Sequence, residues 1–304
     1  MDTLKIKTIK LIELCRDAAE RGSVVITGHD NPDADSVISA VMMKRLMERC
    51  GVVCSVKFPT SPDNVTLRDA RSFGIWDDDF VCPFDDGDVL LLVDHHKSFY
   101  RNTAIACVDH HTTLPVSDCR FPVVIKASSC GKIIYDMMAA VGVADAEDEK
   151  LALYSVYLDT QSCRSSKFNK ADLPWVDECI GKYGIDRESI ERMGFCLNSP
   201  NEPIDVIATY AFKKYEFEKV SASTAIQIDD SDPSWESIIP AAIEIMKCKT
   251  LSDGYAMWAF VVNMPMRMRS DIYFILDSGE VRKLELDRLA SRSRDVIPVV
   301  SSIK

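Results

Sequence analysis

The chain has 304 residues, enough for one large or two ordinary domains, with 47% of them apolar and 27% charged. This composition is typical of a globular protein and argues against a fibrous or disordered chain. The formal net charge of −11 argues against a protein that mainly binds the nucleic-acid backbone, because that task needs an excess of Lys and Arg. We therefore expect no stable nucleic-acid partner.

The eleven cysteines are scattered without a CxxC pair, which is typical of free thiols in a reducing compartment. Residues 3–22 predict an amphipathic helix rather than a signal peptide. No apolar run approaches the roughly 18 residues that would span a bilayer. We therefore expect a cytoplasmic protein without a membrane partner.

The first motif, GHDNPDADS, follows a short apolar strand at residues 24–27. It places His29, Asp33 and Asp35 in a tight turn around Pro32, whose ring fixes its own φ and keeps the preceding residue out of the helical region. An imidazole and two carboxylates are ligand types that suit divalent metals such as Mn²⁺. This turn is therefore a candidate metal site.

The residues after this turn predict a helix. Ser36 is the expected N-cap, apolar residues recur with helical spacing, and Gly51 is the expected stop. A strand, a polar turn and a helix N-terminus in succession form anion or metal sites in open α/β sheets. A second short strand is expected at residues 52–58, followed by a turn-rich segment.

Two further apolar strands, at residues 89–93 and 103–108, end in the same kind of motif. Each is followed by one Asp and two His, which are Asp94, His95 and His96 after the first strand and Asp109, His110 and His111 after the second. Unbroken apolar runs fit parallel strands that are covered on both faces. Because open parallel sheets place ligands at the carboxyl ends of their strands, we expect these motifs to meet there.

The rest of the chain divides at NSPNEP, residues 198–203, which is the best linker candidate. Before it, Ser128 and Ser129 begin a predicted helix, and an apolar helix at residues 151–158 aims Asp159 at one end of the domain. After it, a mixture of helices and strands is expected. The predicted domains are therefore residues 1–197 and 204–304.

All five histidines of the chain lie in the three motifs, a distribution that random placement does not produce. Together with the neighbouring carboxylates they make a metal site the default interpretation. The candidate donors outnumber what one ion can use: His29, Asp33, Asp35, Asp94, Asp109, His110 and Asp159. Two ions bridged by a carboxylate would activate a shared water and bind both reacting oxygens of an in-line phosphoryl displacement. Hydrolysis of a phosphate ester or anhydride is the leading prediction.

The motifs GHDNPDADS, VDHH, VDHH and LDT, in this order, resemble the four motifs of the DHH phosphoesterase superfamily. The C-terminal part resembles the companion domain of its manganese-dependent (family II) inorganic pyrophosphatases, exopolyphosphatases and prune-type proteins. The resemblance implies an α/β fold, in which a parallel-sheet metal-binding domain is followed by a smaller α+β domain that closes over the cleft. It covers nearly the whole chain.

The resemblance also implies a role for individual residues. One metal would be held by His29, Asp33 and Asp94, and a second by Asp35, Asp94, His110 and Asp159, so that Asp94 is the bridge. His111 would face the substrate, and Asp109 would orient the histidines without binding metal directly. The cofactors would be two divalent ions, Mn²⁺ by preference, with Co²⁺ or Mg²⁺ as alternatives.

In the second domain, Lys213 falls where those enzymes carry a phosphate-binding Lys, although Ala211 replaces the Asp of that pattern. Arg292 matches the Arg of their terminal Ser-Arg-Lys motif, whereas Ser293 replaces the Lys and Arg294 follows. Such cations suit phosphate, since Arg binds it bidentately and Lys adds a movable charge. His96, with Lys97 after it, is either an extra substrate contact or a further metal ligand.

The resulting hypothesis is a phosphohydrolase that cleaves inorganic pyrophosphate or short polyphosphate by in-line attack of a metal-bridging hydroxide. Asp94 and His111 would be catalytic, and His111, Lys213, Arg292 and Arg294 would bind a small phosphorylated substrate. Three alternatives stay open: action on longer polyphosphate, a nucleotide or oligonucleotide phosphodiesterase, and a binding protein without turnover. The oligomeric state stays open as well, with a homodimer as one option.

Overall fold

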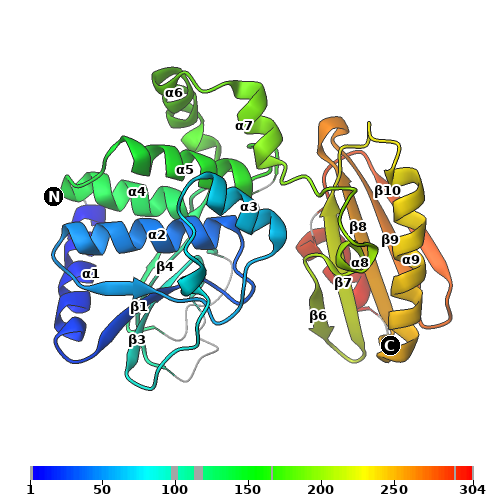
Figure 1. Cartoon of the computed structure of the whole chain (residues 1–304), viewed down its shortest axis with the longest axis horizontal. Helices are drawn as coiled ribbons and strands as arrows, with labels where there is room; N and C mark the ends of the chain where they lie inside the picture. Colours follow the sequence, from blue (N-terminus) through cyan, green and yellow to red (C-terminus); the bar gives the residue numbers. More distant parts are fainter. Residues whose placement is uncertain (1–2, 97–101, 113–118, 166, 291, 303–304) are drawn as a thin grey trace. The chain divides into compact units, whose positions relative to one another are not determined.

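The computed structural model describes residues 3–96, 102–112, 119–165, 167–290 and 292–302. The chain forms two compact units, Met1–Gly194 and Phe195–Lys304, each built around a five-stranded sheet (Figure 1). The predicted fold class, an α/β domain with a parallel sheet followed by a smaller α+β domain, is confirmed.

The sheet of the first unit is parallel throughout, with the strand order β2-β1-β3-β4-β5. Its strands are β1 (Ser23–Thr27), β2 (Cys54–Val56), β3 (Asp88–Val93), β4 (Ala104–Asp109) and β5 (Phe121–Val124). The inner strands β1, β3 and β4 are buried along almost their whole length, which explains their unbroken apolar sequences. Sequence reasoning missed β5, a four-residue edge strand that contains Pro122.

Seven helices accompany this sheet among the described residues. They are α1 (Thr3–Ala19), α2 (Ala34–Arg49), α3 (Asn64–Ser72), α4 (Cys130–Val141), α5 (Ala146–Asp159), α6 (Leu173–Tyr183) and α7 (Arg187–Gly194). Helices α2, α4 and α5 pack against one another, and α2 and α4 also contact the sheet (Figure 1). Ser129 caps α4, as its sequence predicts. Its Oγ accepts a hydrogen bond from the Lys132 backbone N–H at 3.2 Å.

The predicted cap of α2 is wrong. The helix begins at Ala34, and Asp33 is its N-cap, with Oδ1 accepting a hydrogen bond from the Ser36 backbone N–H at 3.1 Å. Both Asp and Ser are good caps, so the residue type alone does not decide between them. The earlier start places Asp35 inside the first turn, and it leaves the Ser36 hydroxyl for another partner.

The second unit has the strand order β10-β9-β8-β7-β6, in which only the β7–β8 pairing is parallel among the described strands. Its elements are α8 (Ile204–Thr209), β6 (Lys213–Glu216), β7 (Val220–Gln227), α9 (Trp235–Ser252), β8 (Met257–Met264), β9 (Arg269–Leu276), β10 (Val281–Leu286) and a C-terminal helical segment (Arg292–Val296, Ile297–Val300). Sequence reasoning missed β10, because its sequence VRKLEL is half charged and mostly exposed.

Strand β8 is buried on both faces. Trp258 and Phe260 pack in one apolar cluster with Met246 of α9, whereas Met257 packs in another with Val296 of the C-terminal segment. Within the predicted linker, Asn198 donates its backbone N–H to the Gln227 carbonyl at 2.7 Å, and its Oδ1 accepts from the Gln227 N–H. None of the described helices combines the length and apolar character that a membrane span requires.

The contact between α4 and α5 needs a glycine. A Cβ on Gly131 would lie 2.5 Å from the Oγ of Ser155 and 2.8 Å from its Cβ. We therefore expect Gly131→Ala to lower the free energy of unfolding by about 1–3 kcal/mol, because the added methyl overpacks the interface. Urea unfolding followed by circular dichroism measures this change.

Gly181→Ala in α6 is the matched control, because nothing lies within 4 Å of a Cβ at that position. There the change should raise the free energy of unfolding by about 0.5–1 kcal/mol, as expected for Gly to Ala in a helix. Equal shifts in the two variants would contradict the packing argument.

Candidate metal centre

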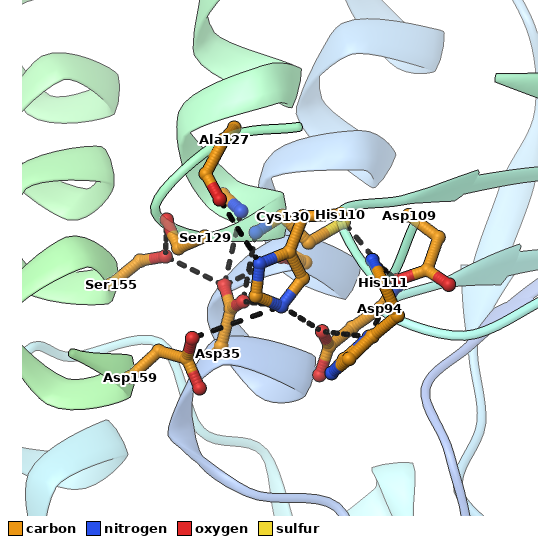
Figure 2. A network of polar contacts seen from close by, with 12 residues as sticks. Asp35, Asp94, Asp109, His110, His111, Ala127, Ser129, Cys130, Ser155 and Asp159 are labelled. Atoms are coloured by element: carbon orange, nitrogen blue, oxygen red, sulfur yellow. Dashed lines mark hydrogen bonds and ion pairs between the residues drawn. The ribbon is translucent and has the colours of Figure 1, made fainter. Parts of the chain in front are cut away.

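The carboxyl ends of the three inner strands carry the predicted donors. His29 follows β1, Asp94 follows β3, and His110 follows β4. Asp33 and Asp35 lie at the N-terminus of α2, and Asp159 is the last residue of α5. The structure thus brings the six predicted metal ligands to one edge of the parallel sheet, where Figure 2 shows Asp35, Asp94, His110 and Asp159 facing one another.

The first group of donors consists of His29, Asp33 and Asp94, whose ligand atoms all lie within 4.8 Å of one another. His29 Nε2 is 3.6 Å from Asp33 Oδ2 and 3.5 Å from Asp94 Oδ2. On the other side of the ring, Nδ1 is 2.8 Å from the carbonyl oxygen of Asp30. Because a carbonyl only accepts, Nδ1 carries a proton, so Nε2 is the ring atom that would bind a metal in place of a proton.

The second group consists of Asp35, His110 and Asp159. His110 Nε2 is 3.7 Å from Asp35 Oδ2, 3.7 Å from Asp159 Oδ2 and 3.3 Å from Asp94 Oδ1. Its Nδ1 is 3.3 Å from the Ala127 carbonyl oxygen, which again leaves Nε2 as the atom that would bind a metal (Figure 2). Asp94 therefore offers one oxygen to each group, as a bridging carboxylate does.

Three donor atoms of this centre are buried and make no hydrogen bond among the described residues: Asp94 Oδ1, His110 Nε2 and Asp159 Oδ2. Buried polar atoms without partners are rare in folded proteins because each costs desolvation free energy. A cation coordinated by these atoms would satisfy all three. The residues present thus fit a divalent metal.

The electrostatics of the centre agree with this fit. Burial, together with the charges of Asp94, Asp159 and Asp33, raises the pKa of Asp35 to about 7 even though His110 opposes the shift. Burial alone would lower the pKa of both imidazoles, but Asp33 raises the pKa of His29 to about 10, and Asp94 raises that of His110 to the same value. The crowded carboxylates therefore attract positive charge.

Asp35 is held by the N-terminus of α4. Its Oδ2 accepts the Cys130 backbone N–H at 2.8 Å, and its Oδ1 accepts the Gly131 N–H at 3.0 Å. The hydroxyls of Ser155 and Ser39 donate to Oδ1 at 2.6 and 3.1 Å. Free N–H groups at a helix N-terminus stabilise an anion, so this carboxylate is fixed before any metal binds.

Asp94 is fixed by its backbone as well as its side chain. Its φ is 61°, in the left-handed region that residues other than glycine rarely adopt. The backbone N–H donates to the Val108 carbonyl at 2.9 Å, and Oδ2 accepts the Ser36 hydroxyl at 2.7 Å. Strained backbone of this kind occurs often at functional sites.

Asp109 joins two histidines. Its Oδ1 accepts both the backbone N–H of His111 at 3.1 Å and the ring Nδ1–H at 2.8 Å, and its Oδ2 pairs with Nδ1 of His96. Burial by itself would raise its pKa, but His111 and His96 hold the pKa of Asp109 well below the ordinary value. The carboxylate is therefore charged, and it orients the 39% exposed His111 ring, whose Nε2 makes no hydrogen bond with the described residues.

His96 is only 1% exposed and contacts Asp109. The buried His96 ring therefore holds the Asp109 carboxylate in place through its Nδ1. Its Nε2 makes no hydrogen bond among the described residues. Lys97 lies outside the described residues.

The cations predicted in the second unit lie near one edge of its sheet. Lys213 begins the edge strand β6. The Arg292 guanidinium donates to the carbonyl of Ala211, which lies two residues before Lys213 in the chain. Ala211 has a φ of 49°, so the backbone turns sharply there. The side chain of Arg294 lies outside the described part of the structure.

Sequence reasoning missed several contributors to the centre. Gly131 and Ser155 fix Asp35, Ser36 holds Asp94, and Lys167 forms an ion pair with Asp159. The SSCG sequence at a predicted helix start was the available signal for Gly131. The sequence offered no such signal for Lys167, which lies in an irregular loop.

Comparison with known proteins agrees with this geometry. The model of the DHH family N-terminal domain matches residues 23–160. The probable manganese-dependent inorganic pyrophosphatase of Deinococcus radiodurans is 25% identical over 209 residues, which are 64% of this chain and 66% of that protein, just under two thirds of its length.

A solved structure shows the same fold. It is that of a Methanococcus jannaschii protein assigned to the family II inorganic pyrophosphatases, and it matches with a TM-score of 0.71 at 18% identity. The match covers 91% of this chain and 98% of the other. The stretch matched by the family model, residues 23–160, contains all six convergent donors and His111. Residues 23–160 are thus similar to the DHH family N-terminal domain.

Proposed function

We propose that the protein is a metal-dependent phosphohydrolase that cleaves the phosphoanhydride bonds of inorganic pyrophosphate or short polyphosphate. The observation that carries this proposal is the pair of donor groups joined by Asp94, with unpartnered buried atoms that a cation would satisfy. The name of the Deinococcus radiodurans relative, a manganese-dependent inorganic pyrophosphatase, supports the metal and the substrate. Mn²⁺ is accordingly the preferred ion.

His29, Asp33 and Asp94 would hold one ion, and Asp35, Asp94, His110 and Asp159 the other. Two divalent ions in such a site supply water activation and neutralise the oxygens of the phosphoryl group. His111, fixed by Asp109, would then donate a hydrogen bond from Nε2 to a phosphoryl or leaving oxygen. A rigid donor costs little reorganisation during the reaction.

The second unit would bind the phosphate groups with Lys213, Arg292 and Arg294. Support comes from the shared location of Lys213 and Arg292 near the start of β6. Arg offers a planar pair of donors to phosphate, and Lys a movable charge. Several cations suit a compact polyanion that has no base to recognise.

A nucleotide substrate is the second candidate. Phe217 of the second unit is 45% exposed and stacks on Tyr215, with ring centroids 6.3 Å apart. Tyr215 lies two residues after Lys213 in the chain. Such a pair could stack on a base. Trp258 cannot serve, since it is buried. A binding protein without turnover is disfavoured, because all six metal donors are present and converge.

The proposal is tested by phosphate release from pyrophosphate, tripolyphosphate, long polyphosphate and nucleotides with Mn²⁺, Co²⁺ or Mg²⁺. We expect the fastest release from pyrophosphate or tripolyphosphate with Mn²⁺, and none after the metal is removed by a chelator. Asp94→Asn should lower kcat at least about 10³-fold, because it weakens the ligand that both ions share.

Added Mn²⁺ should raise the melting temperature of the wild-type protein more than that of Asp94→Asn, since a bound ligand stabilises the native state. The exposed Asp86→Asn is the matched control and should behave as wild type. Unchanged turnover in Asp94→Asn would refute the mechanism.

His111→Gln is expected to lower kcat by about 10²–10³-fold, because it removes a positioned donor to the substrate. Since His111 is not among the proposed metal ligands, Mn²⁺ stoichiometry measured by atomic absorption should stay at the wild-type value. Loss of metal in this variant would show instead that His111 is a ligand.

Arg292→Ala is expected to raise KM for pyrophosphate about tenfold, with kcat changed less, because it removes a charged hydrogen bond to phosphate. Arg282→Ala on β10 is the control, since Arg282 is exposed and pairs only with its neighbour Glu280 among the contacts described. Steady-state kinetics distinguish the two. Equal KM values in both variants would argue against the phosphate contact.

A further inference from the structure

Lys167 reaches the metal centre from the solvent side. Its ammonium forms an ion pair with Oδ1 of Asp159, and its side chain is 49% exposed while that of Asp159 is only 5% exposed. The other oxygen of Asp159 lies 3.7 Å from His110 Nε2. A single carboxylate therefore joins this lysine to the second group of metal donors.

Hydrogen bonds hold the described residues on both sides of Lys167. Gln161, Ser162 and Cys163 all have positive φ, between 51° and 63°, an unusual run for residues other than glycine. The buried Thr160 holds this turn, since its Oγ1 accepts the Cys163 N–H at 3.0 Å and its carbonyl accepts the Ser165 N–H at 2.9 Å. Backbone strain of this kind is characteristic of functional segments.

The far end of the loop is anchored too. The Asn169 backbone N–H donates to Ser128 Oγ at 3.0 Å, and that hydroxyl donates to Asp172. At the start of the loop, the Ser162 hydroxyl donates to the Glu191 carbonyl. This hydroxyl packs closely against α7, since a Cβ on Gly194 would lie only 2.6 Å from Ser162 Oγ. With both ends held, the loop keeps Lys167 beside Asp159.

Charge counting shows why a cation is needed here. The proposed ligands include four carboxylates, Asp33, Asp35, Asp94 and Asp159, whose charges two divalent ions would balance. The two ligating imidazoles are neutral when they bind metal. The loaded centre would therefore have no surplus positive charge for a phosphoryl group that carries several negative charges. Lys167 supplies one within the first unit itself.

We propose that Lys167 is a substrate-binding residue, whose ammonium binds phosphoryl oxygens of a condensed phosphate beside the second group of metal donors. This inference rests on the proposed function, since it takes the phosphohydrolase substrate as its ligand. An ammonium has three N–H donors, of which Asp159 occupies one. Lys167 would thus supply a substrate-binding cation from the first unit itself.

The test is a binding measurement that does not need turnover. Imidodiphosphate, a pyrophosphate analogue with nitrogen in place of the bridging oxygen, is titrated calorimetrically into the full-length protein saturated with Mn²⁺. We expect Lys167→Met to weaken its binding about tenfold or more, because a charged hydrogen bond is lost. Lys167→Arg should retain binding within about threefold, since the charge and donors remain.

Lys170→Met is the matched control, because Lys170 is exposed three residues further along the chain, at the start of a short 3₁₀ helix, and this variant should bind as wild type. Binding of Mn²⁺, followed by the paramagnetic resonance of the free ion, is measured in every variant. Unchanged imidodiphosphate affinity in Lys167→Met, with tighter Mn²⁺ binding, would overturn the inference, because Lys167 would then only neutralise Asp159 before the metal arrives. A wild-type protein that binds no imidodiphosphate would overturn it as well.

Failure of the proposed function gives a different result. A wild-type protein that binds imidodiphosphate but releases no phosphate from any substrate would contradict the hydrolase assignment. In that case, weaker imidodiphosphate binding by Lys167→Met would still support Lys167 as a phosphoryl-binding residue.

Discussion

The bridging position of Asp94 is the constraint on which the site depends. Its two oxygens lie 3.5 Å from His29 Nε2 and 3.3 Å from His110 Nε2. The sheet order makes this possible, because β3 lies between β1 and β4, the strands that precede the two histidines. Adjacent strands are about 4.8 Å apart, so only a side chain from the middle strand reaches both neighbours. The left-handed backbone at Asp94 then directs the carboxylate into the space between them.

The same arrangement makes the centre unfavourable without cations. Buried carboxylates that face one another repel, as the raised pKa of Asp35 reflects. The fold offsets part of this cost with the N–H groups of α4, the hydroxyls of Ser36 and Ser155, and the ammonium of Lys167. Lys167 contacts Oδ1 of Asp159 and leaves Oδ2 facing His110. The Cys130 N–H and the Ser36 hydroxyl instead contact Asp35 Oδ2 and Asp94 Oδ2, the oxygens that also face the imidazoles.

The sequence was most informative where local pattern and function coincide. Unbroken apolar runs ending in Asp and His predicted β3 and β4 and the edge where the donors meet, because strand direction alone brings such ends together. Short or charged edge strands such as β5 and β10 carry no comparable pattern. The start of α2 was wrong for a related reason, since Asp33 and Ser36 are both competent caps and only the three-dimensional contact identifies the one in use.

Residues that position the donors were out of reach for a different reason. Gly131 and Ser155 contact Asp35 from 96 and 120 residues away in the chain, and no local rule connects positions so distant. Gly131 lets its backbone N–H reach Asp35 beside the Ser155 hydroxyl, because a Cβ at this position would collide with that hydroxyl. Lys167 could not be identified from the sequence either, because an exposed lysine in a loop is indistinguishable from an ordinary surface residue until its ion pair with Asp159 is known.

The acidic balance of the chain and a phosphate substrate are compatible only if positive charge is concentrated locally. With a formal net charge of −11, the molecule as a whole repels a polyanion. Under the proposed function, metal ions that only cancel the charges of their own ligands would not reverse this, so the attraction would come from cations beside the centre. Lys167 is fixed there by a strained loop and a buried carboxylate, which places its charge without the entropy cost of ordering a free side chain. Under the proposed function, substrate capture would depend on a few fixed cations, and the net charge of the rest of the surface would mainly limit which other anions approach.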